Sequence, residues 1–196
     1  GVVKALELLE MVENTKLPPL ECLFTVDEET GLTGAFALDG NLLQGRTMLN
    51  LDTEEWGSIC IGCAGGGDSQ LSLPVSYEGA PGDFLSFQLS VEGLKGGHSG
   101  VDIHEYRANA IVLLASVLAP LAKMGTRIVS MQGGDKTNAI PREAFATLLL
   151  PPETMADAQI AVAERAESLK SEYGSLEKGM HVTLVGLEDA PAECLA

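Results

Sequence analysis

Apolar and polar residues alternate most regularly in the second half of the chain. Residues 85–91 are apolar at each odd position and polar at each even position. This pattern predicts a strand with one face against a core and the other in water, as in antiparallel sheets. Three further apolar segments, residues 127–132, 143–150 and 181–187, also read as strands.

Two helices are predicted between these strands. The first begins at Asp102 and Glu105, which have the spacing of a capping box, and is closed by Pro120 and Gly125. The second covers residues 152–173, with apolar side chains on one stripe. The order strand–helix–strand–strand–helix–strand is that of a ferredoxin-like unit, in which two helices cover four antiparallel strands.

The first part of the chain has a different pattern. Residues 2–14 have apolar residues at helical spacing. Residues 20–26, 48–51 and 58–63 are short apolar runs without alternation, which predict strands buried on both faces of a parallel sheet. Residues 31–43 read as a short helical crossover, so the pattern is that of an α/β sheet.

Residues 65–83 are rich in Gly, Pro and Ser and read as a crossing between domains. We therefore expect one domain over residues 1–76 and a second over residues 77–196, with the βαββαβ unit at about 84–188. A parallel sheet of three strands seldom stands alone, so the first domain looks incomplete.

The composition narrows the classes of function. Twelve basic and 28 acidic residues give a net charge of -16, which disfavours binding to nucleic acid and to anionic membranes. Apolar runs are too short for a membrane span, and the first residues do not form a signal peptide. Four cysteines are too few for a disulfide scaffold, so we expect a cytoplasmic protein. Cys60 and Cys63 form a CxxC pair without a second pair, which favours two buried small side chains over a zinc ribbon.

Acidic residues follow two of the predicted strands. Glu28 and Glu29 come after the first and Asp52 after the second, at the edge where α/β sheets bind ligands. Neighbouring side chains in a strand point to opposite sides, so one glutamate could bind a metal while the other faces a bound water. Carboxylates suit zinc, manganese or magnesium. Solvated loop charges would give the same pattern.

Two further candidates lie in loops of the second domain. His98 is surrounded by glycines between a predicted strand and a helix, and Asn138 lies in a glycine-started turn between two strands. A histidine held in such a loop is placed to meet a ligand, because glycine permits close backbone approach. An incidental loop histidine and an ordinary turn asparagine are the alternatives.

Four blocks together resemble a known family. They read DEETGLTGAF, NLDTEEWGSICIGCAGGGD, GLKGGHSGVDIHEYRANA and GGDKTNAIPREAFATL. In this order they are similar to blocks of the aminoacyl-histidine dipeptidases, which belong to the zinc-dependent exopeptidases together with carnosinases, aminoacylase and glutamate carboxypeptidase. The resemblance covers residues 1–150 well and fades afterwards.

The resemblance implies a role for each matching residue. Glu28 matches the general base that deprotonates a metal-bound water, and Glu29 and Asp52 match metal ligands. His98 matches a histidine of the lid that crosses to the partner's active site and polarises the scissile carbonyl, and Asn138 an asparagine that holds the substrate. The implied fold is part of a parallel-sheet catalytic domain followed by a ferredoxin-like lid that also forms the homodimer.

The implied reaction is hydrolysis of Xaa-His dipeptides with two zinc ions, or manganese or cobalt, in each intact site. Other ligands of the family, including two histidines and a bridging aspartate, have no match here. We therefore expect this chain to be an internal piece of the enzyme that is inactive alone. A related amidohydrolase acting on N-acyl amino acids and a non-enzymatic dimerisation module are the alternatives.

Overall fold

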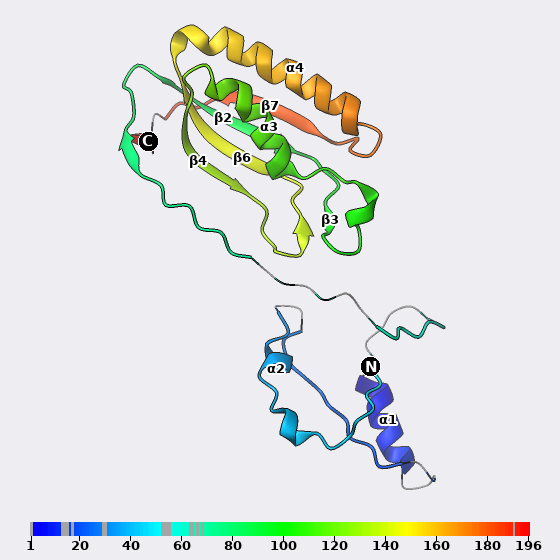
Figure 1. The fold of residues 1–196 in the computed structure, drawn as a ribbon. Helices are drawn as coiled ribbons and strands as arrows, with labels where there is room; N and C mark the ends of the chain where they lie inside the picture. The colour runs from blue at the N-terminus through cyan, green and yellow to red at the C-terminus, as the bar shows by residue number, and fades with distance from the viewer. Residues whose placement is uncertain are drawn as a thin grey trace. The chain divides into compact units, whose positions relative to one another are not determined.

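The computed structural model describes residues 2–12, 16, 18–28, 31–51, 56–62, 65, 67, 69–189 and 191–196 (Figure 1). The chain divides into two compact units, Gly1–Ser69 and Gln70–Ala196. We refer to them as the first unit and the second unit and describe each by itself.

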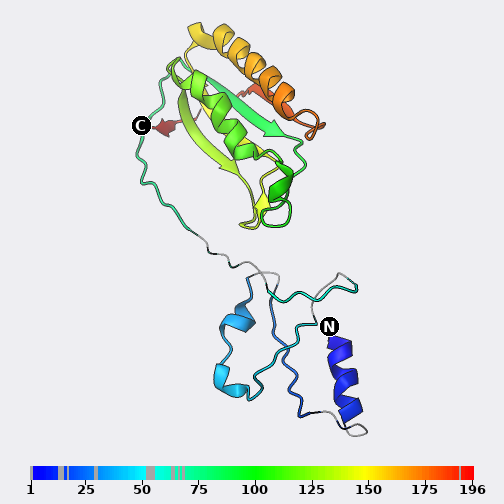
Figure 2. The same ribbon diagram turned by 45° about the vertical axis from the view of Figure 1, so that its right-hand side comes forward.

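The second unit is built on a four-stranded sheet in the order β4-β6-β2-β7. The strands are β2 (Leu85–Glu92), β4 (Arg127–Gly133), β6 (Ala144–Leu150) and β7 (His181–Gly186), and every neighbouring pair is antiparallel. Helices α3 (Ala110–Ala122) and α4 (Met155–Tyr173) cover one face of this sheet (Figures 1 and 2). The predicted ferredoxin-like unit is confirmed.

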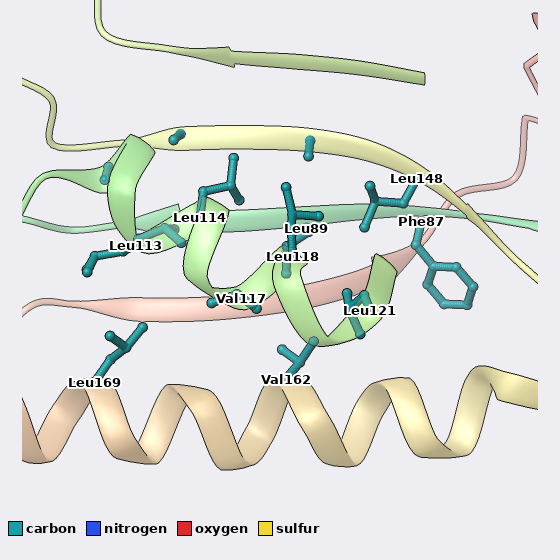
Figure 3. Packing of buried hydrophobic residues seen from close by; sticks show 14 of the residues in the cluster. Phe87, Leu89, Leu113, Leu114, Val117, Leu118, Leu121, Leu148, Val162 and Leu169 are labelled. Atoms are coloured by element: carbon teal, nitrogen blue, oxygen red, sulfur yellow. The ribbon is translucent and has the colours of Figure 1, made fainter. Parts of the chain in front are cut away.

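The core lies between this sheet and the two helices (Figure 3). β2 and β6 contribute Leu89 and Leu148, α3 contributes Val117 and Leu121, and α4 contributes Leu169; all five are fully buried. Each buried side chain of this size stabilises the fold by roughly 1.5–3 kcal/mol relative to an exposed one. Packing of apolar faces therefore holds the second unit together.

The alternation predicted for β2 holds on its core face, whereas its other face differs from the prediction. Ser86 and Ser90 on that face are buried, although water was expected there. β2 has a neighbouring strand on each side, and the Ser90 hydroxyl lies 2.8 Å from the hydroxyl of Thr183 on β7. This central strand therefore buries apolar side chains on its core face and small polar side chains on its other face.

The start of α3 corrects the predicted capping box. Asn109 caps this helix, because its Oδ1 accepts hydrogen bonds from the backbone N–H groups of Ile111 and Val112. Asp102 makes no capping bond and precedes only the short 3-10 helix η2 (Ile103–Glu105). Its carboxylate instead binds an arginine, as described below.

Shorter elements complete the second unit. The 3-10 helix η3 (Pro152–Thr154) leads into α4, and Gly174 ends α4 as predicted. Two small antiparallel pairs join β1 (Tyr77–Gly79) to β8 (Glu193–Leu195) and β3 (Gly97–His98) to β5 (Ala139–Ile140).

The first unit contains α1 (Val2–Val12), α2 (Thr33–Phe36) and the 3-10 helix η1 (Gly40–Leu42). Residues 20–26, 48–51 and 58–62 form no strand, so the three strands predicted there are wrong for the part of the chain described. Their apolar side chains are exposed, Ile59 to 91%, and Cys60 is exposed rather than buried. A strand of a parallel sheet is stable only beside neighbouring strands, and the described part of this unit supplies none.

Among the residues that the structure describes, no helix is both long enough and apolar enough to cross a membrane.

Candidate functional site

The pairing of β3 with β5 brings two of the predicted site residues together. His98 pairs with Ala139, and the backbone N–H of Ser99 donates to the carbonyl of Asn138 at 2.9 Å. The glycine-rich loop and the turn that carries Asn138 are therefore neighbours, although about forty residues separate them in the sequence. Both His98 and Asn138 are exposed.

The His98 ring is fixed by its own loop. Its Nδ1 accepts hydrogen bonds from the backbone N–H groups of Gly100, at 3.0 Å, and Val101, at 3.1 Å. Its Nε2 forms no hydrogen bond with any residue that the structure describes. One nitrogen of the ring is thus held by the protein and the other is left to meet a ligand.

Two glycines of this loop are required by what surrounds them. Gly97 has φ 147°, and a Cβ there would lie 2.1 Å from Nη1 of Arg107 and 2.6 Å from Oδ2 of Asp102. A Cβ at Gly100 would lie 3.3 Å from the His98 ring. The glycines therefore make room for an ion pair and for the imidazole.

The ion pair joins Asp102 and Arg107 and extends to Glu105. Arg107 donates to both oxygens of Asp102 at 3.1 Å and to Glu105 at 2.8 Å. Hydrogen bonding to Glu105 raises the pKa of Arg107, and hydrogen bonds from Arg107 and then Lys95 lower the pKa of Glu105. Arg107 and Glu105 are therefore both charged at neutral pH.

Glu177 supports the base of the same loop. It is only 2% exposed, and its carboxylate accepts hydrogen bonds from the backbone N–H groups of Lys95, at 2.7 Å, and Ala108, at 3.0 Å. These two residues stand on either side of the segment that carries His98. A buried carboxylate from the chain between α4 and β7 thus fixes both ends of the segment.

A cavity of about 500 Å³ adjoins β3 and β5. Three cationic side chains line it, Lys95, Lys136 and Arg142, against two acidic ones, Asp135 and Glu143. Cationic side chains therefore outnumber acidic ones in the lining of this cavity, in a chain that is acidic as a whole.

The candidate metal ligands are only partly described. Glu28 is exposed, and its backbone carbonyl accepts the N–H groups of Gly31 and Leu32 in a turn. Glu29 and Asp52 lie outside the described residues. Within the described part of the chain, no group of three His, Cys, Asp or Glu side chains could hold a metal ion.

Comparison with known proteins shows which proteins this arrangement is similar to. Residues 89–177 match the family described as the peptidase dimerisation domain. This match spans a little under half of the chain. The matched residues contain most of the ferredoxin-like unit, including the His98 loop and Asn138.

Two relatives extend the similarity beyond the dimerisation domain. The chain is 41% identical over 197 residues to the cytosol non-specific dipeptidase of Escherichia coli (strain K12), covering 100% of this chain and 40% of that protein. The crystal structure of aminoacylhistidine dipeptidase from Vibrio alginolyticus matches with a TM-score of 0.71 and 35% identity, covering 88% of this chain and 35% of that one. The chain thus spans about two fifths of the curated relative, and its resemblance to the aminoacylhistidine dipeptidases is confirmed.

The sequence analysis did not identify the residues that hold the His98 loop in place. Asp102 and Arg107 lie in one of the blocks that carry the family resemblance, so their opposite charges near His98 were available as a signal. The role of Glu177 could not be recognised from the sequence. It is far from His98 along the chain and lies near polar residues of types that are common at protein surfaces.

Proposed function

We propose that this chain is part of a metal-dependent dipeptidase that hydrolyses Xaa-His dipeptides. The proposal is supported by the similarity to a dipeptidase along the whole chain and by the structural match to an aminoacylhistidine dipeptidase. We also propose a cytoplasmic location, in line with the name of the curated relative. The first unit would then belong to a parallel-sheet catalytic domain, of which residues 1–76 form a part.

The observation that carries the proposal is the hydrogen bonding of the two ring nitrogens of His98. Its Nδ1 is held by two backbone N–H groups, and its Nε2 makes no hydrogen bond with the described residues. We propose that residues 77–196 form the lid and the homodimer, and that His98 reaches the partner's active site. There the Nε2–H would donate to the carbonyl oxygen of the scissile bond, where negative charge develops.

The remaining roles follow from the resemblance. We propose that Glu28 is the general base, that Asn138 holds the substrate, and that Glu29 and Asp52 bind metal. A bound zinc, manganese or cobalt ion would supply Lewis acidity for the attacking water. The described residues form no ligand cluster that fits such an ion, so we derive no step through it.

The role of Glu28 is tested by substitution in the full-length protein. We expect Glu28→Ala to lower turnover of an Xaa-His dipeptide by a factor on the order of 10²–10⁴, because a general base contributes that much. The metal content, measured by atomic spectroscopy, should stay largely unchanged. Glu10→Ala removes another exposed carboxylate, on α1, and is the matched control. Activity retained in Glu28→Ala would refute the assignment.

The role of His98 in the partner's site is tested by mixing two inactive variants. Subunits that carry His98→Ala and subunits that carry Glu28→Ala would form hybrid dimers with one intact site. About one quarter of the wild-type activity should return after random exchange, because half of the dimers are hybrids with one working site each. If mixing restores no activity while exchange is confirmed by mass spectrometry, His98 acts within its own subunit or not at all.

Two further measurements separate the alternatives. A substrate panel of Xaa-His dipeptides and N-acyl amino acids distinguishes a dipeptidase from a related amidohydrolase. We also propose that the metal site of this chain is incomplete, and zinc titration of the 196-residue chain by calorimetry tests this. We expect weak binding or none, whereas two tightly bound zinc ions would contradict a partial site.

A further inference from the structure

We infer that Asp102 and Arg107 are positioning residues that hold His98 in one tautomer, with the ring proton on Nε2. This inference rests on the proposed function, since it states how the histidine is prepared to donate to a substrate carbonyl. It starts from the contacts of the loop that joins His98 to Asp102.

Reciprocal bonds close this loop. The backbone N–H of His98 donates to Oδ2 of Asp102 at 2.8 Å, and the backbone N–H of Asp102 donates to the carbonyl of His98 at 3.0 Å. Between these two bonds, the N–H groups of Gly100 and Val101 turn inward and meet Nδ1 of the ring. These N–H groups point at Nδ1 of His98 in this conformation of the loop. We infer that the loop keeps this conformation only while the Asp102 carboxylate stays in position.

Arg107 holds Asp102 by a forked contact. Its Nη1 and Nη2 donate to the two oxygens of Asp102, each at 3.1 Å. Arg107 is fixed in turn, because Nη1 also donates to the carbonyl of Gly96 at 2.6 Å and Nε donates to Glu105. The Arg107 side chain is only 12% exposed. A lysine could not reproduce a planar fork with three nitrogens in contact with acceptors.

The hydrogen-bond pattern assigns the tautomer. A ring nitrogen that accepts two N–H groups carries its lone pair toward them and no proton. In the neutral imidazole the proton is then on Nε2, the nitrogen with no hydrogen bond to the described residues. Donation from Nε2 is what polarisation of a carbonyl oxygen requires. If the fork were lost, the loop could open and both tautomers would be populated.

The direct test is the ¹⁵N spectrum of the His98 ring in the 196-residue chain, recorded at about pH 9 so that imidazoles are neutral. The wild-type protein should show an unprotonated Nδ1 and a protonated Nε2. Asp102→Asn and Arg107→Lys should each move both nitrogens toward averaged positions, which indicates exchange between tautomers. Arg165→Lys is the matched control, because Arg165 on α4 donates its hydrogen bonds to Ser116 and Ser168, away from the His98 loop, and its spectrum should be that of the wild type.

Activity supplies the second measurement, in the full-length protein with an Xaa-His dipeptide. Asp102→Asn and Arg107→Lys should lower kcat by a factor on the order of 10², with KM changed far less, because misplacing a reacting group costs that much. Backbone amide spectra identify variants that fail to fold, and Asp102→Glu, which keeps the charge, then replaces Asp102→Asn.

The inference is overturned if His98 carries its proton on Nδ1 in the wild type, or if both variants keep the wild-type tautomer. It is also overturned if the tautomer is lost while kcat stays within about twofold of the wild-type value. A full-length protein without dipeptidase activity would refute the proposed function, whereas the ring spectrum would still decide whether Asp102 and Arg107 fix the tautomer.

Discussion

Glu177 offers the sharpest test of how the His98 segment is held in place. Its two carboxylate oxygens accept one backbone N–H each, from Lys95 at 2.7 Å and from Ala108 at 3.0 Å, at a site where the residue is 2% exposed. Hydrogen bonds to charged groups contribute about 1.5–3 kcal/mol each. Removing the carboxylate also relieves the cost of burying it, so the two bonds do not simply add.

We therefore expect Glu177→Ala to lower the free energy of unfolding by about 3 kcal/mol, since two buried N–H groups lose their acceptor. Glu177→Gln should cost about 1–2 kcal/mol, because its amide keeps one oxygen but turns an NH₂ group toward the other N–H. Against a typical stability of about 5–15 kcal/mol, both changes are large enough to measure.

The assay is urea unfolding of the 196-residue chain followed by far-ultraviolet circular dichroism. Fluorescence is unsuitable, because the single tryptophan, Trp56, is fully exposed in the first unit and does not report on the second. Glu164→Ala is the matched control, since Glu164 lies exposed on α4, and it should change stability by no more than about 0.5 kcal/mol. The reasoning is refuted if Glu177→Ala costs no more than this control.

Three other outcomes are expected. Leu148→Ala should cost about 2–5 kcal/mol in urea unfolding because it leaves a cavity in the core, whereas Leu85→Ala, at a side chain that is 41% exposed, should cost far less. Gly97→Ala should destabilise the second unit by at least about 1 kcal/mol, because its Cβ would collide with the ion pair at a positive φ; Gly82→Ala, where a Cβ meets nothing within 4 Å, should not. Hydrogen bonds from two backbone N–H groups lower the pKa of Glu21, so in an NMR titration its carboxyl should protonate below the ordinary value of 4.5. The stability that this carboxylate adds is therefore present above pH 4.5 and is lost as pH falls through the lowered pKa, and titration at or above 4.5 would contradict the assignment.

The ferredoxin-like unit could be predicted from the sequence because each of its elements has its packing partners within residues 77–196. The alternation in β2 and the stripe on α4 both point to the same core. The three apolar runs of the first unit have no such partners in the described residues. Periodicity indicates what a segment could bury, but a strand forms only where a neighbouring backbone accepts and donates its hydrogen bonds.

The site was predictable in part for a related reason. The loop glycines and His98 are adjacent in the sequence, so their spacing was informative. The capping box was misread, because Asp102 and Glu105 have the right spacing but Arg107 competes for both carboxylates. An ion pair with an arginine two to five residues away is stronger than a bond to one backbone N–H. Glu177 could not be found, because only the tertiary fold brings it to the loop.

The central position of β2 in the sheet has a consequence for how the second unit folds during synthesis. β2 pairs with β6 and β7, which follow it by roughly fifty to ninety residues. During synthesis the apolar side chains of Phe87, Leu89 and Val91 leave the ribosome long before either partner strand exists. The nascent chain must therefore keep an unpaired, aggregation-prone strand in solution, and folding should be slow for a unit of this size.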